Sequence, residues 1–431
     1  MTDGPIKRIH GGRIIDPHVN LDAVLDLLIE GDRIKALLGP DDEYPGVDEV
    51  IDAKGLLVTP GLVDIHVHLR EPGQEYKETV ATGTKAAAAT GITTVACMAN
   101  TDPPNDNAGI TKYILRKAAE AGFARVAPIG AVSKNLCGEE LSEMNELVEA
   151  GCVAFSDDGK PVMNAELMRC ALEYAGGLSK AIIVHAEDSE LVRGGVMNEG
   201  AVSTELGLIG IPAAAEEVMI ARDILLAEMT GSPIHFAHVS AAGSVELIRR
   251  AKEKGLPVTA ETCPHYFTLT EEAVRGYDTR ARVNPPLRTE RDVNAIINGL
   301  ADGTIDCITS DHAPHARHEK EVEFEIALCG ISGIETLLGL TLKLVENGNL
   351  SLIDALGKLT IAPSRILGLE AGTLARGAPA DVALIDPQVS WTVDPAKFHS
   401  KGKFTPFEGM KLRGRAVKTL VGGRIIQVND L

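Results

Sequence analysis

Two histidines lie two positions apart in the segment Gly61-Leu-Val-Asp-Ile-His-Val-His-Leu-Arg70. The aliphatic and β-branched residues around them favour a strand, and alternation along a strand places the His66 and His68 imidazoles on one face. Two neutral imidazoles on one face are a candidate ligand pair for Zn, Co, Ni or Fe. Arg70 follows on the same face and could hold an anion. The spacing therefore predicts a metal site, for which the rest of the chain must supply further ligands.

Further histidines and aspartates lie where other apolar runs of the chain end. One run ends in Asp157 and Asp158, two others reach His185 and His238, and a fourth ends in Asp311. A single histidine at a strand end is more often a structural polar group than a ligand, but several such ends on one rim indicate a shared site. The candidate metal ligands are His66, His68, Asp158, His185, His238 and Asp311.

These residue types indicate hydrolytic chemistry. Four imidazoles and two carboxylates can hold two divalent ions, and a bridging carboxylate keeps such ions about 3.5–4 Å apart. Water bound to one of them ionises near neutral pH, which provides a hydroxide nucleophile. Asp311 could accept a proton from that hydroxide and deliver it to a leaving nitrogen, acting first as a base and then as an acid. The structural alternative is an aspartate that caps the turn Asp311-His-Ala-Pro.

Only one of two adjacent aspartates can face the site from the fourth strand. Phe155 shares a face with Asp157 and is expected to point outward to the helices. Ala154 and Ser156 share a face with Asp158, and small or polar residues suit a barrel interior. We therefore expect Asp158 to be the bridging ligand.

The elements that must position these residues alternate between strand and helix. Eight strands that alternate with helices over ~250 residues predict an α/β fold, a (β/α)₈ TIM-type barrel spanning 61–370, with the site at the carboxyl ends of the strands. An open doubly wound sheet is the alternative, but no Gly-x-Gly-x-x-Gly or P-loop motif supports nucleotide binding. The expected strands are 62–69, 92–99, 124–132, 152–158, 180–187, 233–240, 257–263 and 305–311. The expected helices include 78–89, 110–120, 139–149, 213–229, 244–254 and 290–300.

Both ends of the chain have a different pattern from the middle. Short strand-like segments separated by glycine pairs occupy 1–60 and 371–431, and the run Gly-Gly-Arg-Ile-Ile occurs at 11–15 and again at 422–426. This predicts one small β-sandwich domain assembled from both termini.

The composition excludes several classes of partner. A net charge of −19 argues against nucleic acid or an anionic membrane surface. No run of about 18 apolar residues predicts a membrane span. The seven cysteines are odd in number, scattered and without a Cys-x-x-Cys pair, which indicates reduced thiols. Residues Met1–Pro5 show no signal-peptide pattern, so we expect a cytoplasmic protein.

Two motifs resemble the signatures of the dihydroorotase family within the amidohydrolase superfamily. They are Asp64-Ile-His-Val-His-Leu-Arg-Glu-Pro72 and Ser310-Asp-His-Ala-Pro-His315, the second followed by Lys320. Other segments resemble the class I branch of that family, the longer bacterial type, so the resemblance covers nearly the whole chain. These segments are 154–159, 184–187, 237–240, 260–266 and 284–288.

The resemblance implies a reaction and a set of roles. The family catalyses the reversible, zinc-dependent cyclisation of N-carbamoyl-L-aspartate to L-dihydroorotate in pyrimidine synthesis. His66, His68 and Asp311 would bind a first zinc ion, His185 and His238 a second, and Asp158 would bridge them, although one ion remains an alternative to two. The resemblance also suggests a homodimer, or association with aspartate transcarbamoylase. The expected substrate-binding residues are His68, Arg70, Asn100, Asn284, His315, Cys329 and Gly330, with Arg70 and His315 supplying positive charge for the substrate carboxylate.

The chain departs from family patterns at a few positions. Many superfamily members bridge their metals with a carboxylated lysine, but the fourth strand has no lysine before Lys160. The usual Met-Pro-Asn-Thr has Ala99 in place of proline, and Thr309 replaces a smaller residue. Two rival interpretations follow. One is a hydantoinase, dihydropyrimidinase or allantoinase, and the other is a non-catalytic dihydroorotase-like subunit, which would lack metal ligands. The charged segment 316–325 could form a lid over the substrate.

Overall fold

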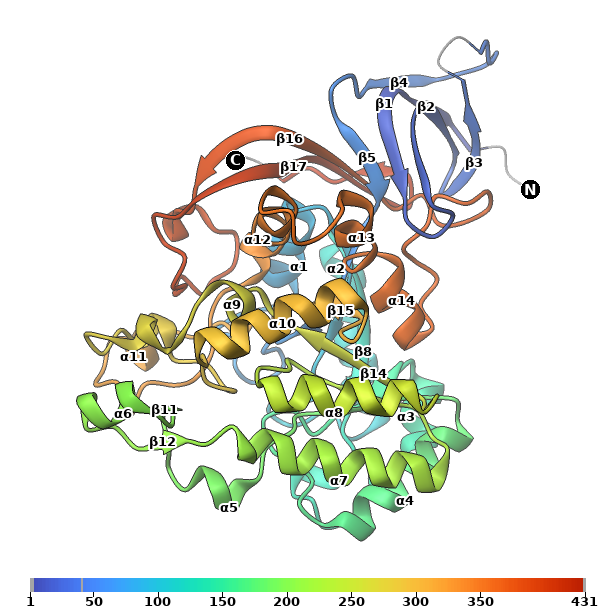
Figure 1. The fold of residues 1–431 in the computed structure, drawn as a ribbon. Coiled ribbons are helices and arrows are strands. Elements are labelled where there is room, and N and C mark those ends of the chain that lie inside the picture. The colour runs from blue at the N-terminus through green and yellow to red at the C-terminus, as the bar shows by residue number, and fades with distance from the viewer. Residues whose placement is uncertain (1–3, 40–41, 429–431) are drawn as a thin grey trace.

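The computed structural model describes residues 4–39 and 42–428 of the 431-residue chain (Figure 1). Residues 1–3, on which part of the predicted absence of a signal peptide depends, lie outside the described residues. No helix within the described ranges has the length and apolar character needed to cross a membrane.

A parallel eight-stranded sheet forms the middle of the chain, and it closes into a barrel. The pairing Val67–His312 and a hydrogen bond of 2.8 Å from the His68 amide to the His312 carbonyl join the first strand to the segment after the last. The predicted barrel is confirmed, and the open sheet is excluded. In order the strands are β6 (Leu62–Val67), β7 (Ile92–Cys97), β8 (Arg125–Gly130), β9 (Ala154–Phe155), β10 (Ile182–Val184), β13 (Ile234–Phe236), β14 (Val258–Thr262) and β15 (Cys307–Ile308).

These strands lie within the predicted ranges but are shorter. The residues that follow each strand leave the hydrogen-bonded ladder to form the loops of the carboxyl rim, and the candidate site residues lie in those loops. Asp158, His185, His238 and Asp311 all follow the last paired residue of their strands. The apolar, β-branched runs therefore predicted the positions of the strands correctly but overestimated their lengths.

Helices cover the outside of the barrel (Figure 1). The predicted helices are present, and α4, which the sequence did not single out, begins after Asn164, whose side chain accepts hydrogen bonds from the Glu166 and Leu167 amides. The main helices are α1 (Val80–Ala89), α2 (Ala108–Ala121), α3 (Met144–Ala150), α4 (Ala165–Gly177), α7 (Ala214–Thr230), α8 (Ala242–Glu253), α10 (Glu290–Asp302) and α12 (Leu337–Glu346). Shorter elements are α5 (Ser189–Val192), α6 (Ala201–Leu206), α9 (Pro264–Thr268), α11 (Arg317–Lys320), α13 (Leu352–Gly357), α14 (Ile361–Leu367), β11 (Met197–Asn198) and β12 (Gly210–Ile211).

The two ends of the chain form one further sheet and the predicted β-sandwich. Its strand order is β18-β17-β16-β5-β1-β2-β3, with β4 beside β1. The antiparallel pair β5–β16 joins the N-terminal strands to the C-terminal ones, whereas the two Gly-Gly-Arg-Ile-Ile runs do not pair with each other. The strands are β1 (Ile6–Asp16), β2 (Leu21–Glu30), β3 (Arg33–Leu38), β4 (Glu49–Asp52), β5 (Leu57–Pro60), β16 (Val382–Thr392), β17 (Lys411–Val421) and β18 (Arg424–Ile425).

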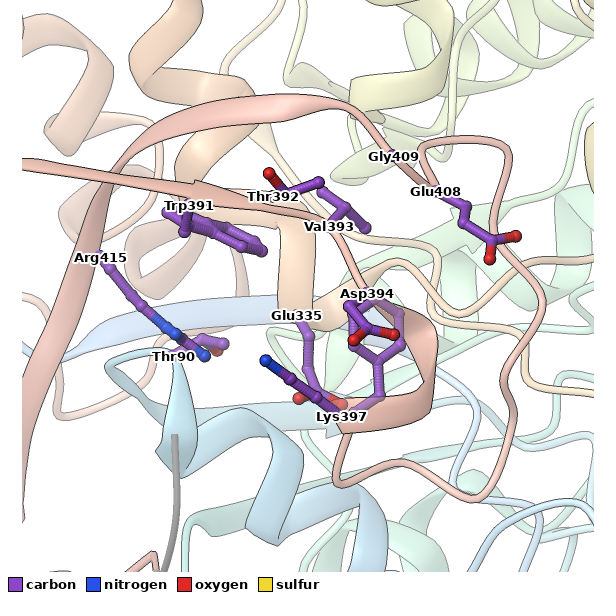
Figure 2. Close-up of a pocket in the computed structure, with 11 residues that line it drawn as sticks. Thr90, Glu335, Trp391, Thr392, Val393, Asp394, Lys397, Glu408, Gly409 and Arg415 are labelled. Atoms are coloured by element: carbon purple, nitrogen blue, oxygen red, sulfur yellow. The ribbon is translucent and has the colours of Figure 1, made fainter.

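The long hairpin β16–β17 lies against the barrel next to α1 and α12 (Figure 1). Its close approach requires Gly91, which has φ of 87° and where an added Cβ would lie 3.1 Å from the Cβ atoms of Ala383 and Ala416. A cavity of about 790 Å³ remains where the hairpin meets the barrel, with Trp391 and Arg415 on one side and Glu335 on the other (Figure 2).

The junction between β5 and β16 yields a first prediction. Leu384 is buried and pairs with Val58 across the junction, so Leu384→Ala should lower the free energy of unfolding by about 2–5 kcal/mol through lost burial and a residual cavity. Urea denaturation followed by circular dichroism measures this change. Val417→Ala, at an exposed position of the neighbouring strand β17, is the control and should change stability by less than about 0.5 kcal/mol. Equal effects of the two substitutions would contradict the packing described.

Candidate metal and substrate site

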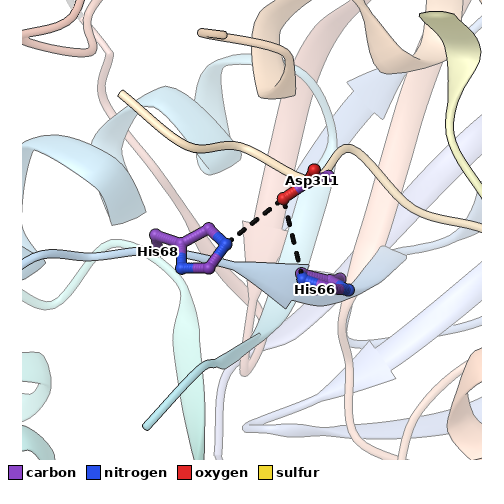
Figure 3. A group of neighbouring side chains, drawn as sticks. All are labelled: His66, His68 and Asp311. Atoms are coloured by element: carbon purple, nitrogen blue, oxygen red, sulfur yellow. Dashed lines mark hydrogen bonds and ion pairs between the residues drawn. The ribbon is translucent and has the colours of Figure 1, made fainter. Parts of the chain in front are cut away.

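His66 in β6 and His68 just after it face an aspartate from the opposite end of the barrel sequence (Figure 3). His68 Nε2 lies 3.2 Å and His66 Nε2 lies 3.6 Å from Asp311 Oδ1, and all three side chains are buried. The pairing of β6 with β7 is irregular between Asp64 and Val67, which is where a strand can re-aim its side chains. The structure thus brings the two imidazoles and Asp311 to one point.

Asp158 lies at the centre of all four candidate imidazoles. Its Oδ1 is 3.6 Å from His66 Nε2, 3.5 Å from His185 Nδ1 and 3.4 Å from His238 Nε2. Its Oδ2 is 3.6 Å from His68 Nε2. A buried carboxylate at the centre of four imidazoles is a candidate bridging ligand.

The adjacent aspartate has a different environment. Asp157 Oδ1 accepts hydrogen bonds from the amides of Val132 at 2.7 Å and Ser133 at 3.1 Å, and its Oδ2 accepts one from the Ser133 hydroxyl. Asp157 therefore ties the loop after β8 to the loop after β9. The structure places Asp158, and not Asp157, among the histidines, as alternation along the strand predicts.

The donor atoms of this cluster fit a divalent cation. Among the residues that the structure describes, His66 Nε2, Asp158 Oδ1 and His238 Nδ1 are buried without a hydrogen-bond partner, which is costly unless another group satisfies them. Two sets of three ligand atoms, from His66, His68 and Asp311 and from His66, Asp158 and His238, lie within 4.8 Å of one another. Imidazole and carboxylate together are the ligand types of hydrolytic zinc sites.

The electrostatics of the cluster are dominated by contacts between carboxylates and imidazoles. Burial alone would raise the pKa of Asp158, but the surrounding imidazoles hold that pKa well below its usual value. Burial lowers the pKa of His185, but Asp158 and Glu187 more than offset it and raise that pKa to about 10. These opposed shifts show that the buried carboxylate and the imidazoles around it stabilise each other's charged forms.

The predicted substrate-binding residues lie together beside the metal ligands. They line one cavity of about 250 Å³ that also receives Asp158, His185, His238 and Asp311. Arg70 is buried there, and its Nε donates to the Pro314 carbonyl at 3.3 Å. Within residues 4–39 and 42–428 no carboxylate lies within ion-pair distance of Arg70, so its charge is available to an anion in the cavity. The residues that line the cavity are His68, Arg70, Asn100, Asp158, Gly159, His185, His238, Asn284, Asp311, Ala313, His315, Leu328, Cys329 and Gly330.

Asn100 contacts the metal ligands as well as the cavity. Its Oδ1 accepts a hydrogen bond from His68 Nδ1 at 2.9 Å, and its Nδ2 donates to Asp158 Oδ2 at 3.3 Å. Asn100 thus orients two ligands at once. Ala99, which replaces the usual proline, is fully buried against Ala131 and Leu136, so the loop is held without it.

His315 differs from the sequence-based expectation in its charge. We expected a positive imidazole, but burial together with Arg70, Lys320 and Lys77 lowers the pKa of His315 to about 3. The ring is therefore neutral at physiological pH, and its Nε2 donates to the Cys329 carbonyl at 2.7 Å. Arg70 supplies the positive charge in this cavity, and His315 supports the loop at Cys329.

The loop that carries Cys329 and Gly330 is tightly held. Gly330 has φ of 134°, and an added Cβ would lie 2.6 Å from the Ala313 carbonyl oxygen, so only glycine fits. The buried Lys320 ammonium donates to the carbonyls of Leu328 at 2.8 Å and Gly330 at 3.0 Å. These contacts tie the segment 316–325 to the wall of the cavity. From the sequence alone, this segment is a candidate lid over the substrate.

Sequence reasoning missed one buried carboxylate that contacts a ligand. Glu261 Oε1 lies 2.5 Å from His66 Nδ1, on the side of the ring away from Asp158. The available signal was an acidic residue in the middle of the strand predicted at 257–263. In the sequence, Glu261 stands out only as part of the segment 260–266 that resembles the family.

Comparison with known proteins agrees with this geometry. A family model described as Dihydro-orotase-like matches residues 55–244. A dihydroorotase of Geotalea daltonii is 58% identical over 422 residues, which cover 98% of this chain and 99% of the relative. A dihydroorotase of Syntrophus aciditrophicus is 53% identical with the same coverage. The chain belongs to the dihydroorotase family. The family resemblance read from the motifs is thereby confirmed.

Solved structures of related enzymes share the fold. The L-hydantoinase (dihydropyrimidinase) of Arthrobacter aurescens superposes with a TM-score of 0.88 at 25% identity, covering 99% of this chain and 96% of that one. A D-hydantoinase (dihydropyrimidinase) from Thermus sp. gives a TM-score of 0.83 at 27% identity, covering 97% and 94%. This chain therefore shares its fold over nearly its full length with enzymes named hydantoinase and dihydropyrimidinase.

The two aspartates that follow β9 form a matched pair for a second prediction. Asp158→Asn should remove at least one equivalent of bound metal, because a neutral amide cannot bridge two cations. Asp157→Asn should leave the metal content unchanged and lower the melting temperature, because it weakens the loop contacts to Val132 and Ser133. Elemental analysis of both purified variants measures the metal. Equal metal content in the two would refute the assignment.

Proposed function

We propose that this chain is a class I dihydroorotase, which reversibly hydrolyses the ring amide of L-dihydroorotate to N-carbamoyl-L-aspartate in pyrimidine synthesis. The observation that carries the proposal is the buried guanidinium of Arg70 in the same cavity as five of the six candidate metal ligands. The sixth, His66, has its Nε2 3.6 Å from Asp158 Oδ1 and 3.6 Å from Asp311 Oδ1. Dihydroorotate is a cyclic amide with a carboxylate substituent, so it needs both features. The full-length similarity to proteins named dihydroorotase supports the same reaction.

The proposed cofactor is zinc, with two ions favoured. His66, His68 and Asp311 would hold one ion, His185 and His238 the other, and Asp158 would bridge. Divalent zinc supplies a Lewis acid for the amide carbonyl and lowers the pKa of water near it. The catalytic work of the chain itself then lies in positioning the substrate and moving one proton.

Asp311 is the residue placed to move that proton. Its Oδ1 faces His66 and His68, which leaves Oδ2 for the attacking water. Burial would raise the pKa of Asp311, but the neighbouring imidazoles hold it below the usual value, so the carboxylate begins as a base. In the hydrolytic direction the water oxygen bonds to the ring carbonyl carbon, Asp311 takes the proton, and that proton passes to the departing ring nitrogen.

Other residues of the cavity would orient the ring. Arg70 would pair with the substrate carboxylate, and the Asn284 side chain, whose Nδ2 lies 3.4 Å from His185 Nε2, would contact a ring amide. The main chain at Cys329 and Gly330 would contact the other amide atoms. In this arrangement the reacting carbonyl faces the metal ligands and the carboxylate faces away from them.

The rival activities are less well supported. Hydantoinases share the fold, but their substrates need carry no carboxylate, and a buried Arg70 without an ion-pair partner in residues 4–39 and 42–428 would then be unexplained. A non-catalytic subunit would lack metal ligands, whereas all six positions here hold histidine or aspartate within one cluster. A cytoplasmic location, a homodimer and association with aspartate transcarbamoylase are part of the proposal through family resemblance.

Paired substrates test the function and the role of Arg70. The zinc-loaded protein should hydrolyse dihydroorotate far faster than dihydrouracil, which has the same ring without the carboxylate, or hydantoin. Arg70→Met should raise KM for dihydroorotate by about 10- to 100-fold, because a charge-assisted contact contributes about 1.5–3 kcal/mol. The slow hydrolysis of dihydrouracil should change little. Turnover of hydantoin alone would refute the proposed function, and an unchanged KM would refute the anion site.

A substitution at Asp311 tests the proton transfer. Asp311→Asn should lower kcat for dihydroorotate by at least about 10²-fold, the usual contribution of a positioned general acid–base group. Its metal content should stay near that of the wild type, because the remaining five ligands persist. Stopped assays in both reaction directions, with metal analysis of the same samples, measure the two quantities. Near-normal turnover would contradict the role assigned to Asp311.

A further inference from the structure

A line of polar side chains runs through the barrel interior beneath the metal ligands. His66 Nδ1 lies 2.5 Å from Glu261 Oε1, and Glu261 Oε2 lies 3.2 Å from His235 Nε2. His235 Nδ1 in turn lies 2.9 Å from the Thr259 hydroxyl. The line thus extends from a candidate metal ligand on β6 to the adjacent strands β13 and β14.

This polar line contrasts with the rest of the interior. Strands β6, β7, β8, β9, β10 and β15 contribute apolar or small residues to one buried cluster that includes Val63, Ala96, Ile129, Ala154, Ile183 and Cys307. The outward residues of β14, Val258 and Ala260, belong to the separate core beneath the helices. The residues that alternate with these two along β14, Thr259 and Glu261, are polar. An aliphatic side chain would fill the same space, so packing alone does not explain Glu261.

A buried carboxylate is costly unless charged or hydrogen-bonding partners satisfy it. Glu261 is only 1% exposed, and each of its two oxygens contacts one imidazole. His235 has no exposed surface and does not line the substrate cavity, so its role is to contact Glu261 and not the substrate. The arrangement is therefore directed at the Nδ1 atom of His66.

We propose that Glu261 is a positioning residue for the metal site, with His235 holding it in place. Glu261 Oε1 accepts a hydrogen bond from His66 Nδ1. This bond fixes the tautomer of the ring and orients the Nε2 lone pair toward Asp158 and Asp311. His235 donates to the other oxygen of Glu261 and prevents the carboxylate from rotating away. This inference rests on the metal site of the proposed function and adds two residues outside the ligand set.

His66 and His68 would then differ as ligands. His68 Nδ1 donates to a neutral amide oxygen of Asn100, whereas His66 Nδ1 donates to a carboxylate. A carboxylate partner makes an imidazole more basic and a stronger metal ligand than a neutral acceptor does. His66 is also the ligand shared by both three-residue sets, so its orientation affects both cation positions.

Cys307 lies close to Glu261 and His235 but does not take part. Burial raises the pKa of its thiol well above the usual value. Because Glu261 already contacts both His66 and His235, we assign His235 and Glu261 to the support of the site above and not to a second metal site with Cys307.

Metal affinity of variants tests the inference without depending on activity. Glu261→Gln should weaken Zn²⁺ binding about 10- to 100-fold in chelator competition, the usual effect of losing such a partner. It should also shift the visible absorption of the Co²⁺-loaded protein. Asp223→Asn, which alters a buried carboxylate of α7 paired with Arg222, is the matched control and should change neither quantity.

A second pair of variants separates positioning from packing. His235→Gln keeps a donor near the Nε2 position and should retain Zn²⁺ affinity within about threefold, whereas His235→Leu removes the donor and should weaken binding as Glu261→Gln does. This pair carries the test if Glu261→Gln does not fold. Wild-type affinity and an unshifted Co²⁺ spectrum in Glu261→Gln, or equal affinities of the two His235 variants, would overturn the inference. Absence of metal binding by the wild type would instead refute the proposed function.

Discussion

The contact of one carboxylate with four imidazoles is the interaction on which the site depends. Asp158 follows β9, and the histidines around it come from β6, β10 and β13. Buried charges of this density are stable only when cations or hydrogen bonds compensate them. The barrel must therefore hold its carboxyl rim rigidly, because a small shift of any one strand would leave a charged group unpaired.

Contacts below the carboxyl rim of the barrel and at the rim itself provide this rigidity. Below the rim, Glu261 and His235 support His66 from inside the barrel. At the rim, Asn100 joins His68 to Asp158, and Asp157 joins two neighbouring loops. Glu261, His235 and Asp157 are buried and Asn100 is partly buried. Glu261 and Asn100 contact candidate ligands directly, and His235 acts through Glu261. The ligand geometry is thus determined by a shell of neutral and paired groups as much as by the strands.

The sequence predicted the barrel, the β-sandwich and the members of the cluster for identifiable physical reasons. Apolar β-branched runs separated by helical segments mark the strands, and ligand residues are recognisable because His and Asp are rare at such strand ends. Alternation distinguished Asp158 from Asp157. The same periodicity could not show that Glu261 contacts His66, because they are 195 residues apart and the contact depends on barrel closure. It also could not show the charge of His315, since that pKa depends on burial and on cations from other segments.

The neutral His315 changes how an acidic protein can bind an anion. With a net charge of −19, long-range attraction of a carboxylate is unfavourable, and binding must come from short contacts. Arg70 provides one buried cation, and a second charge at His315 would repel it across the same small cavity. Keeping the imidazole neutral leaves a hydrogen-bond donor that holds Cys329 while Arg70 retains its full charge for the ligand. In the proposed function, selectivity for a carboxylate-bearing ring would therefore depend on the Arg70 guanidinium, which donates to the Pro314 carbonyl and lines the same cavity as the candidate metal ligands.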